Sequence, residues 1–202
     1  MQHISDWNEL RDKIHANAVE HGFWENNPSP EHFLCLVISE LMESVEAHRK
    51  RKHADVKAYN DGMESSTEVP KRYRHDTDIF RQSRPNVVFE KYIKDTVEDE
   101  LADAVIRILD LAGGRKVSLF SLYDSSIVLD SLSHISNRNS FTENIYDVVR
   151  YITCEMDLSF RLTIALRMIE AIAELNDIDL AWHIENKMIY NASRSYKHGK
   201  MY

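Results

Sequence analysis

The sequence predicts an all-α protein, and three observations support this class. Five glycines and four prolines among 202 residues are few for a fold rich in turns or phosphate-binding loops. Residues with high helix propensity dominate the composition. Apolar residues recur at the three- and four-residue spacing of amphipathic helices. With 43% hydrophobic residues, the chain is long enough for a single domain with a substantial core, covering residues 1–202.

The first two expected helices cover residues 4–22 and 30–52. Apolar residues of the first helix follow a helical spacing: Ile4, Trp7, Leu10, Ile14 and Ala18. Gly22 ends this helix, and the segment FWENNPSP is expected to be a loop. Ser29 is the expected N-cap of the second helix, because Pro30 follows it and fits the first helical position.

The rest of the chain predicts further helices separated by polar segments. Residues 53–90 have no sustained period and indicate a long loop or insertion. A third helix is expected from about Phe89 to Gly113 and Gly114, which stop it. The segment SLYDSSIVLDSLSHISNRNS indicates loop with one short helix. Three more helices are expected at about 141–156, 158–175 and 178–193.

Charge and hydropathy exclude several kinds of partner. The formal net charge is -8 and the pI is near 5.7, so no nucleic acid polymer is expected as a partner. The longest apolar run, FLCLVI, is too short to span a membrane, and the polar start MQHISDWNELRDK does not resemble a signal peptide. A cytoplasmic protein without a membrane partner is therefore expected. Cys35 lies inside the apolar run and is expected to be a small buried side chain.

Two pairs of acids border the apolar stripes of their helices. Glu40 and Glu43 lie at i, i+3 on the second helix, and Glu100 and Asp103 repeat that spacing on the third. Two carboxylates about 6 Å apart repel by roughly 3 kcal/mol at an effective dielectric of 20. If the helices face one another, a divalent cation would relieve this repulsion, and oxygen ligands favour Mg²⁺, Mn²⁺ or Ca²⁺. A solvated acidic edge is the alternative that the spacing leaves open.

These segments resemble the MazG-like, all-α nucleotide pyrophosphohydrolases. The resemblance rests on ISELMESVEAHRK and DTVEDELADAVIRILDLAGG, which carry Glu-x-x-Glu and Glu-x-x-Asp, and on the flanking HGFWENNP and HIENKMIYNASRSYKHGKMY. It covers roughly residues 1–56, 88–114 and 176–202. The two remaining stretches, about 57–88 and 115–175, are expected to be insertions into a MazG-like helical bundle.

The resemblance implies a function and a set of site residues. Similar proteins hydrolyse nucleoside triphosphates between the α- and β-phosphates to give a nucleoside monophosphate and pyrophosphate, often to clean the nucleotide pool. It implies that a metal ion, Mg²⁺ with Mn²⁺ as an alternative, is bound by residues that are also catalytic: Glu40, Glu43, Glu100 and Asp103. It further implies a homodimer or a tetramer.

The substrate is expected to contact aromatic and basic residues outside the acids. The residues expected to bind it are Trp24, Lys187, Asn191 and Arg194. Trp24, together with Phe23, would stack on the base, with packing in the core as the alternative. Lys187, Asn191 and Arg194 would contact the phosphates, and Arg107 is expected to pair with Asp103. Two questions stay open: which base and sugar are preferred, and whether the protein is instead a catalytically silent nucleotide-binding or interaction scaffold.

Overall fold

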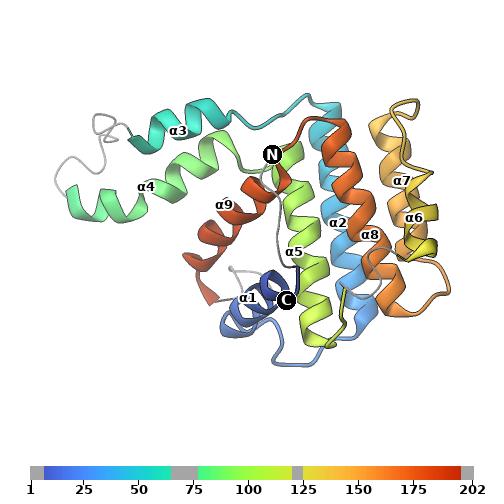
Figure 1. Cartoon of the computed structure of the whole chain (residues 1–202). Helices are drawn as coiled ribbons and strands as arrows, with labels where there is room; N and C mark the ends of the chain where they lie inside the picture. Colours follow the sequence, from blue (N-terminus) through green and yellow to red (C-terminus); the bar gives the residue numbers. More distant parts are fainter. Residues whose placement is uncertain (1–6, 65–76, 120–124, 197–202) are drawn as a thin grey trace.

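The computed structural model describes residues 7–64, 77–119 and 125–196, and these form helices and connecting turns without a strand. The predicted all-α class is therefore confirmed (Figure 1). In chain order, the helices are α1 (Trp7–Glu20), α2 (Pro30–Arg49), α3 (Val56–Glu64), α4 (Thr77–Tyr92), α5 (Val97–Gly114), α6 (Ser126–Leu132), α7 (Phe141–Ile152), α8 (Leu158–Leu175) and α9 (Leu180–Ala192). None of them is long and apolar enough to cross a membrane.

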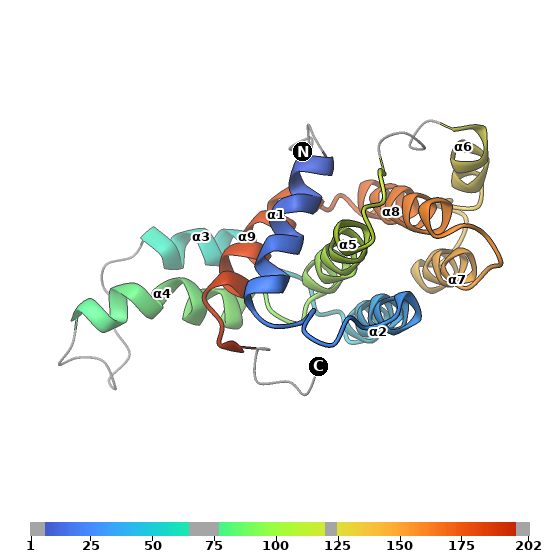
Figure 2. The same cartoon turned by 90° about the horizontal axis from the view of Figure 1, so that it is seen from below.

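Helix α5 is the centre of the structure. It contacts α1, α2, α8 and α9, which surround it in both views (Figures 1 and 2). Its sequence explains this position, because apolar side chains cover most of its circumference, including Leu101, Val105 and Leu109, which are fully buried. The segment expected to be the second insertion folds into α6, α7 and α8, whose apolar residues join the same core as α1, α2 and α5.

Local capping signals set the ends of several helices. Ser29 is the N-cap of α2, as predicted, and its side chain accepts a hydrogen bond from the backbone N–H of His32. Cys35, in contrast, is exposed, so the expectation of a buried cysteine is wrong. The apolar run is longer than the buried stripe of α2, and Cys35 falls on the side opposite Val37 and Leu41.

The expected third helix is interrupted where the chain passes from α4 to α5. Asp95 has a positive φ of 58°, and Thr96 then caps α5 by accepting a hydrogen bond from the N–H of Asp99. The Thr96 hydroxyl also donates to the carbonyl oxygen of Ile93. A continuous helix from Phe89 to Gly114 was the wrong prediction, because a capping threonine and one left-handed residue outweigh the apolar period.

Helices α3 and α4 form an arm that extends from the bundle (Figures 1 and 2). The prediction of a long loop over residues 53–90 is therefore wrong where the structure describes them. The arm has its own apolar cluster, in which Phe89 stacks on Tyr190 of α9 with ring centroids 4.6 Å apart. Two backbone hydrogen bonds close its base: the N–H of Val97 donates to Lys52, and the N–H of Asp55 donates to Tyr92. Contacts between residues distant in the sequence stabilise the arm, so the spacing of apolar residues within it does not predict its helices.

One buried histidine on α9 has a ring nitrogen without a hydrogen-bond partner. His183 is 3% exposed, packs edge-on against Trp182, and its Nδ1 has no hydrogen-bond partner. Burial lowers the pKa of His183 to about 4, against the smaller opposing effect of Glu98 and Asp179. Below pH 6.5 His183 is protonated in the unfolded chain but stays neutral in the native state. The free energy of unfolding therefore decreases as the pH falls toward 4.

We expect His183→Leu to reduce the acid sensitivity of the protein. Between pH 7 and pH 4.5, the wild-type free energy of unfolding should fall by about 2 to 3 kcal/mol more than that of the variant. Urea denaturation at the two pH values measures this difference. An equal fall in both proteins would show that burial does not lower the pKa of His183 in the native state.

Candidate functional site

Three of the four predicted acids meet where α2 packs on α5. Carboxylate oxygens of Glu40, Glu100 and Asp103, hereafter the acidic cluster, all lie within 4.8 Å of one another. Glu40 and Glu100 are only 7% and 4% exposed, so this is not a solvated edge. Glu43 lies outside the cluster: its side chain is exposed and accepts a hydrogen bond from the Ser39 hydroxyl at 3.2 Å. The structure therefore brings together one acid of the first pair and both acids of the second.

Burial makes the acidic cluster costly to ionise. Burial and, to a smaller extent, the neighbouring charges of Asp103 and Asp99 raise the pKa of Glu100 to about 9, against the opposing effect of Lys187. Glu100 has no ion-pair partner among the described residues. A divalent cation bound here would replace its proton, because carboxylates bind metals in the deprotonated form.

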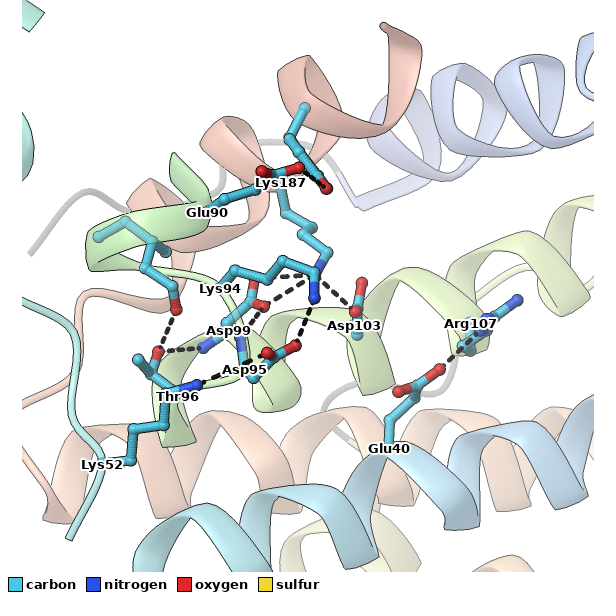
Figure 3. Close-up of polar contacts among 12 residues, drawn as sticks. Glu40, Lys52, Glu90, Lys94, Asp95, Thr96, Asp99, Asp103, Arg107 and Lys187 are labelled. Atoms are coloured by element: carbon cyan, nitrogen blue, oxygen red, sulfur yellow. Dashed lines mark hydrogen bonds and ion pairs between the residues drawn. The ribbon is translucent and has the colours of Figure 1, made fainter. Parts of the chain in front are cut away.

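Two cations of the chain pair with members of the acidic cluster (Figure 3). The Nε of Arg107 donates to Glu40 across the α2–α5 contact at 3.1 Å. Arg107 therefore pairs with Glu40, and the expectation that it pairs with Asp103 is wrong. Asp103 instead contacts the ammonium of Lys187, which lies 2.7 Å from its Oδ2.

Lys187 is a buried side chain on α9. Its Nζ also lies 2.9 Å from both carboxylate oxygens of Asp99, and its side chain is 5% exposed. Burial alone would lower the pKa of Lys187, but the carboxylates of Asp103 and Asp99 outweigh it and raise that pKa. Lys187, which was predicted to contact phosphate, thus already forms ion pairs with two acids. Its position is that of a residue that holds Asp103 in place.

A pocket lies along α5 beside the acidic cluster. It encloses about 650 Å³, a value that includes space open to solvent. Asp103 and Arg107 lie on its α5 wall, and two of the predicted substrate residues, Asn191 and Arg194, lie on its other side. The remaining lining residues are Ile14, Asn17, Ala18, Phe23, Ile106, Asp110 and Met188. The pocket joins part of the acidic cluster to basic, amide and aromatic groups from three regions of the chain.

Trp24 packs against the core and does not line this pocket. Its ring stacks on Phe33 with centroids 4.4 Å apart, and its Nε1 donates to Oδ1 of Asp110 at 2.8 Å. A Cβ added to Gly114 would lie 2.0 Å from the Trp24 ring. Gly114 therefore gives Trp24 the room to approach α5. Phe23, the neighbouring aromatic residue, does line the pocket.

Asp110 is one of the pocket residues that the sequence interpretation missed as site residues. It is 4% exposed and lies seven residues after Asp103, which places both acids on one face of α5. The available signal was an acid inside the apolar run VIRILDLA, the same kind of anomaly that singled out Glu40. Asp99 was missed as well, because its role as the partner of Lys187 depends on how α9 packs.

Comparison of this chain with protein-family models, with curated proteins and with solved structures finds no match. We therefore infer a function from the contacts described above.

We expect Lys187→Met to destabilise the fold by about 3 to 5 kcal/mol, because it leaves Asp99 and Asp103 buried without their cation. Urea denaturation measures the loss, with Lys50→Met as a matched control on the exposed end of α2. Adding Asp99→Asn should restore part of the stability, since it removes one unpaired charge. A loss no larger than that of Lys50→Met would show that the buried pair contributes nothing.

We expect Gly114→Ala to cost about 1 to 3 kcal/mol, although alanine favours helices, because its methyl group would overlap the Trp24 ring. Thermal denaturation checks the stability, and the tryptophan emission spectrum checks the displacement of Trp24. Gly62→Ala is the control, since its nearest neighbour is a valine methyl carbon at 3.0 Å. Higher stability in Gly114→Ala would contradict the tight approach.

Proposed function

We propose that the protein is a Mg²⁺-dependent nucleoside triphosphate pyrophosphohydrolase. It would cleave between the α- and β-phosphates and release a nucleoside monophosphate and pyrophosphate. The observation that carries this proposal is the convergence of Glu40, Glu100 and Asp103 beside a pocket that contains Arg107 and Arg194. The family resemblance of the two acidic motifs supports the same reaction.

The donor set of the acidic cluster fits a hard divalent cation. It offers only carboxylate oxygens, which Mg²⁺ and Mn²⁺ prefer, and has neither the histidine nor the cysteine typical of zinc sites. Glu40, Glu100 and Asp103 would hold the ion. The resemblance implies Glu43 as a fourth ligand, but the structure leaves Glu43 exposed outside the cluster, so the proposed ligand set has three acids. When bound, such an ion neutralises phosphate charge and lowers the pKa of a water molecule.

The chain supplies its own groups for the substrate. Arg107, Asn191 and Arg194 line the pocket and would donate hydrogen bonds to phosphate oxygens. Lys187 would orient Asp103 instead of touching the phosphates, since both of its acidic partners lie within 2.9 Å. Positioning and charge stabilisation of this kind are the main requirements of phosphoryl chemistry.

Two further parts of the proposal rest on the resemblance. The first is a role in removing noncanonical or deoxynucleoside triphosphates from the nucleotide pool. The second is assembly as a homodimer or a tetramer.

A second candidate is a scaffold that binds nucleotides or a protein without turnover. The ion pairs favour it, because Arg107 already balances Glu40 and Lys187 already balances Asp103 without a metal ion. Tight nucleotide binding without pyrophosphate release would identify this function.

The test is pyrophosphate release from ribo- and deoxynucleoside triphosphates in Mg²⁺, with the wild type beside Glu40→Gln and Glu43→Gln. We expect release by the wild type and a loss on the order of 100-fold or more in Glu40→Gln, which removes a buried charge of the acidic cluster. Glu43→Gln is the matched control and should lose less, because Glu43 is exposed outside the cluster.

Two outcomes would contradict the proposal. A folded wild type that releases no pyrophosphate is not this enzyme. Equal losses in the two glutamine variants would show that Glu43 joins the ligand set, against the three-residue cluster seen in the structure.

A further inference from the structure

The pocket has two chemically different ends along α5. Asp103 belongs to the acidic cluster, and Asp110 lies seven residues later on the same face, which corresponds to about 10 Å along the helix axis. This length is comparable with the distance from the α-phosphate to the far edge of the base in a nucleotide. The lining also includes the apolar residues Ile14 and Ala18, which lie on the same helix as the His15 that bonds Asp110, and Phe23, the neighbour of Trp24. One end of the pocket suits phosphate, and the other suits a flat ring with a polar edge.

Asp110 presents one carboxylate oxygen to the pocket. Its Oδ1 accepts hydrogen bonds from His15 Nδ1 at 2.9 Å and from Trp24 Nε1 at 2.8 Å. These two donors occupy the acceptor positions of that oxygen. Its Oδ2 accepts no hydrogen bond from a described residue. Asp110 is only 4% exposed, but its Oδ2 is not fully enclosed, so a molecule in the pocket can reach this oxygen and donate a hydrogen bond to it.

The surroundings of Asp110 hold the carboxylate in a fixed orientation. His15 and Trp24 pack edge to face, with ring centroids 4.8 Å apart, and each lies against a glycine of α5. A Cβ on Gly113 would lie 2.5 Å from the His15 side chain, as one on Gly114 would clash with Trp24. The two rings, the two glycines and Asp110 therefore form a rigid unit, and a preorganised acceptor of this kind discriminates between ligands.

We infer that Asp110 selects the base of the substrate by accepting a hydrogen bond from an exocyclic amine. The inference rests on the proposed function, since it assigns the base within the same pocket. Cytosine and adenine carry an amine at this edge, whereas uracil, thymine, guanine and hypoxanthine carry a carbonyl oxygen there. The amide of Asn17, also in the pocket, would donate to the adjacent ring nitrogen of an amino base. A carbonyl oxygen would face the Asp110 carboxylate with no proton between them.

The test compares bases that differ at this one group. We expect kcat/KM for CTP to exceed that for UTP, and ATP to exceed ITP, by on the order of 100-fold. Asp110→Asn should lower or invert both ratios, because the amide can donate to a carbonyl oxygen. Asp130→Asn, a matched change at an exposed acid on α6, should leave the ratios unchanged. Circular dichroism checks that both variants fold.

Equilibrium binding separates this inference from the proposed reaction. Calorimetry with CMP and UMP, which lack the bond to be cleaved, should show the same preference for the amino base. If no triphosphate is hydrolysed but CMP binds on the order of 100-fold more tightly than UMP, the hydrolase proposal fails and base selection stands. Two results would overturn the inference. The first is equal kcat/KM values for CTP and UTP and for ATP and ITP. The second is an Asp110→Asn variant whose affinities for CMP and UMP fall by the same factor.

Discussion

The structure depends on how it neutralises the acids that a buried helix carries. Helix α5 is surrounded on most sides, yet Asp99, Glu100 and Asp103 occupy its first two turns. Unpaired charges buried this deeply would cost more free energy than folding provides. Lys187 of α9 meets this requirement for Asp99 and Asp103, and Arg107 does the same for Glu40 on α2, whereas Glu100 has no ion-pair partner among the described residues. The docking of α9, which also forms the far wall of the pocket and contacts the arm, is therefore tied to the charges of the site.

Features encoded by neighbouring residues could be predicted from the sequence, and features that depend on packing could not. Ser29 and Pro30 predict the start of α2, and the two acidic pairs indicate that α2 and α5 contact one another. The arm was missed because Tyr59 and Phe89 find apolar partners only across the hairpin and on α9. The placement of Glu43 outside the acidic cluster depends on how α2 rotates against α5, and an i, i+3 spacing does not determine that rotation.

Trp24 illustrates how one residue can serve a site from outside it. The sequence interpretation left stacking on a base and packing in the core as alternatives, and the structure places the ring against Phe33 and Gly114. From there the indole still reaches the pocket through its hydrogen bond to Asp110. Its influence on a ligand would pass through the orientation of that carboxylate, and Phe23 provides the aromatic surface that lines the pocket.

The closed base of the α3–α4 arm has a consequence for how such chains diverge. Backbone hydrogen bonds from Val97 to Lys52 and from Asp55 to Tyr92 join the two chain segments that connect the arm to the bundle. The spatial relation between Glu40 and Glu100 depends on the contact between α2 and α5 and on this closed junction, so the length of polypeptide beyond the junction does not determine it. Evolution, or a protein engineer, could lengthen, shorten or replace the outer part of the arm while both acidic motifs keep their mutual register.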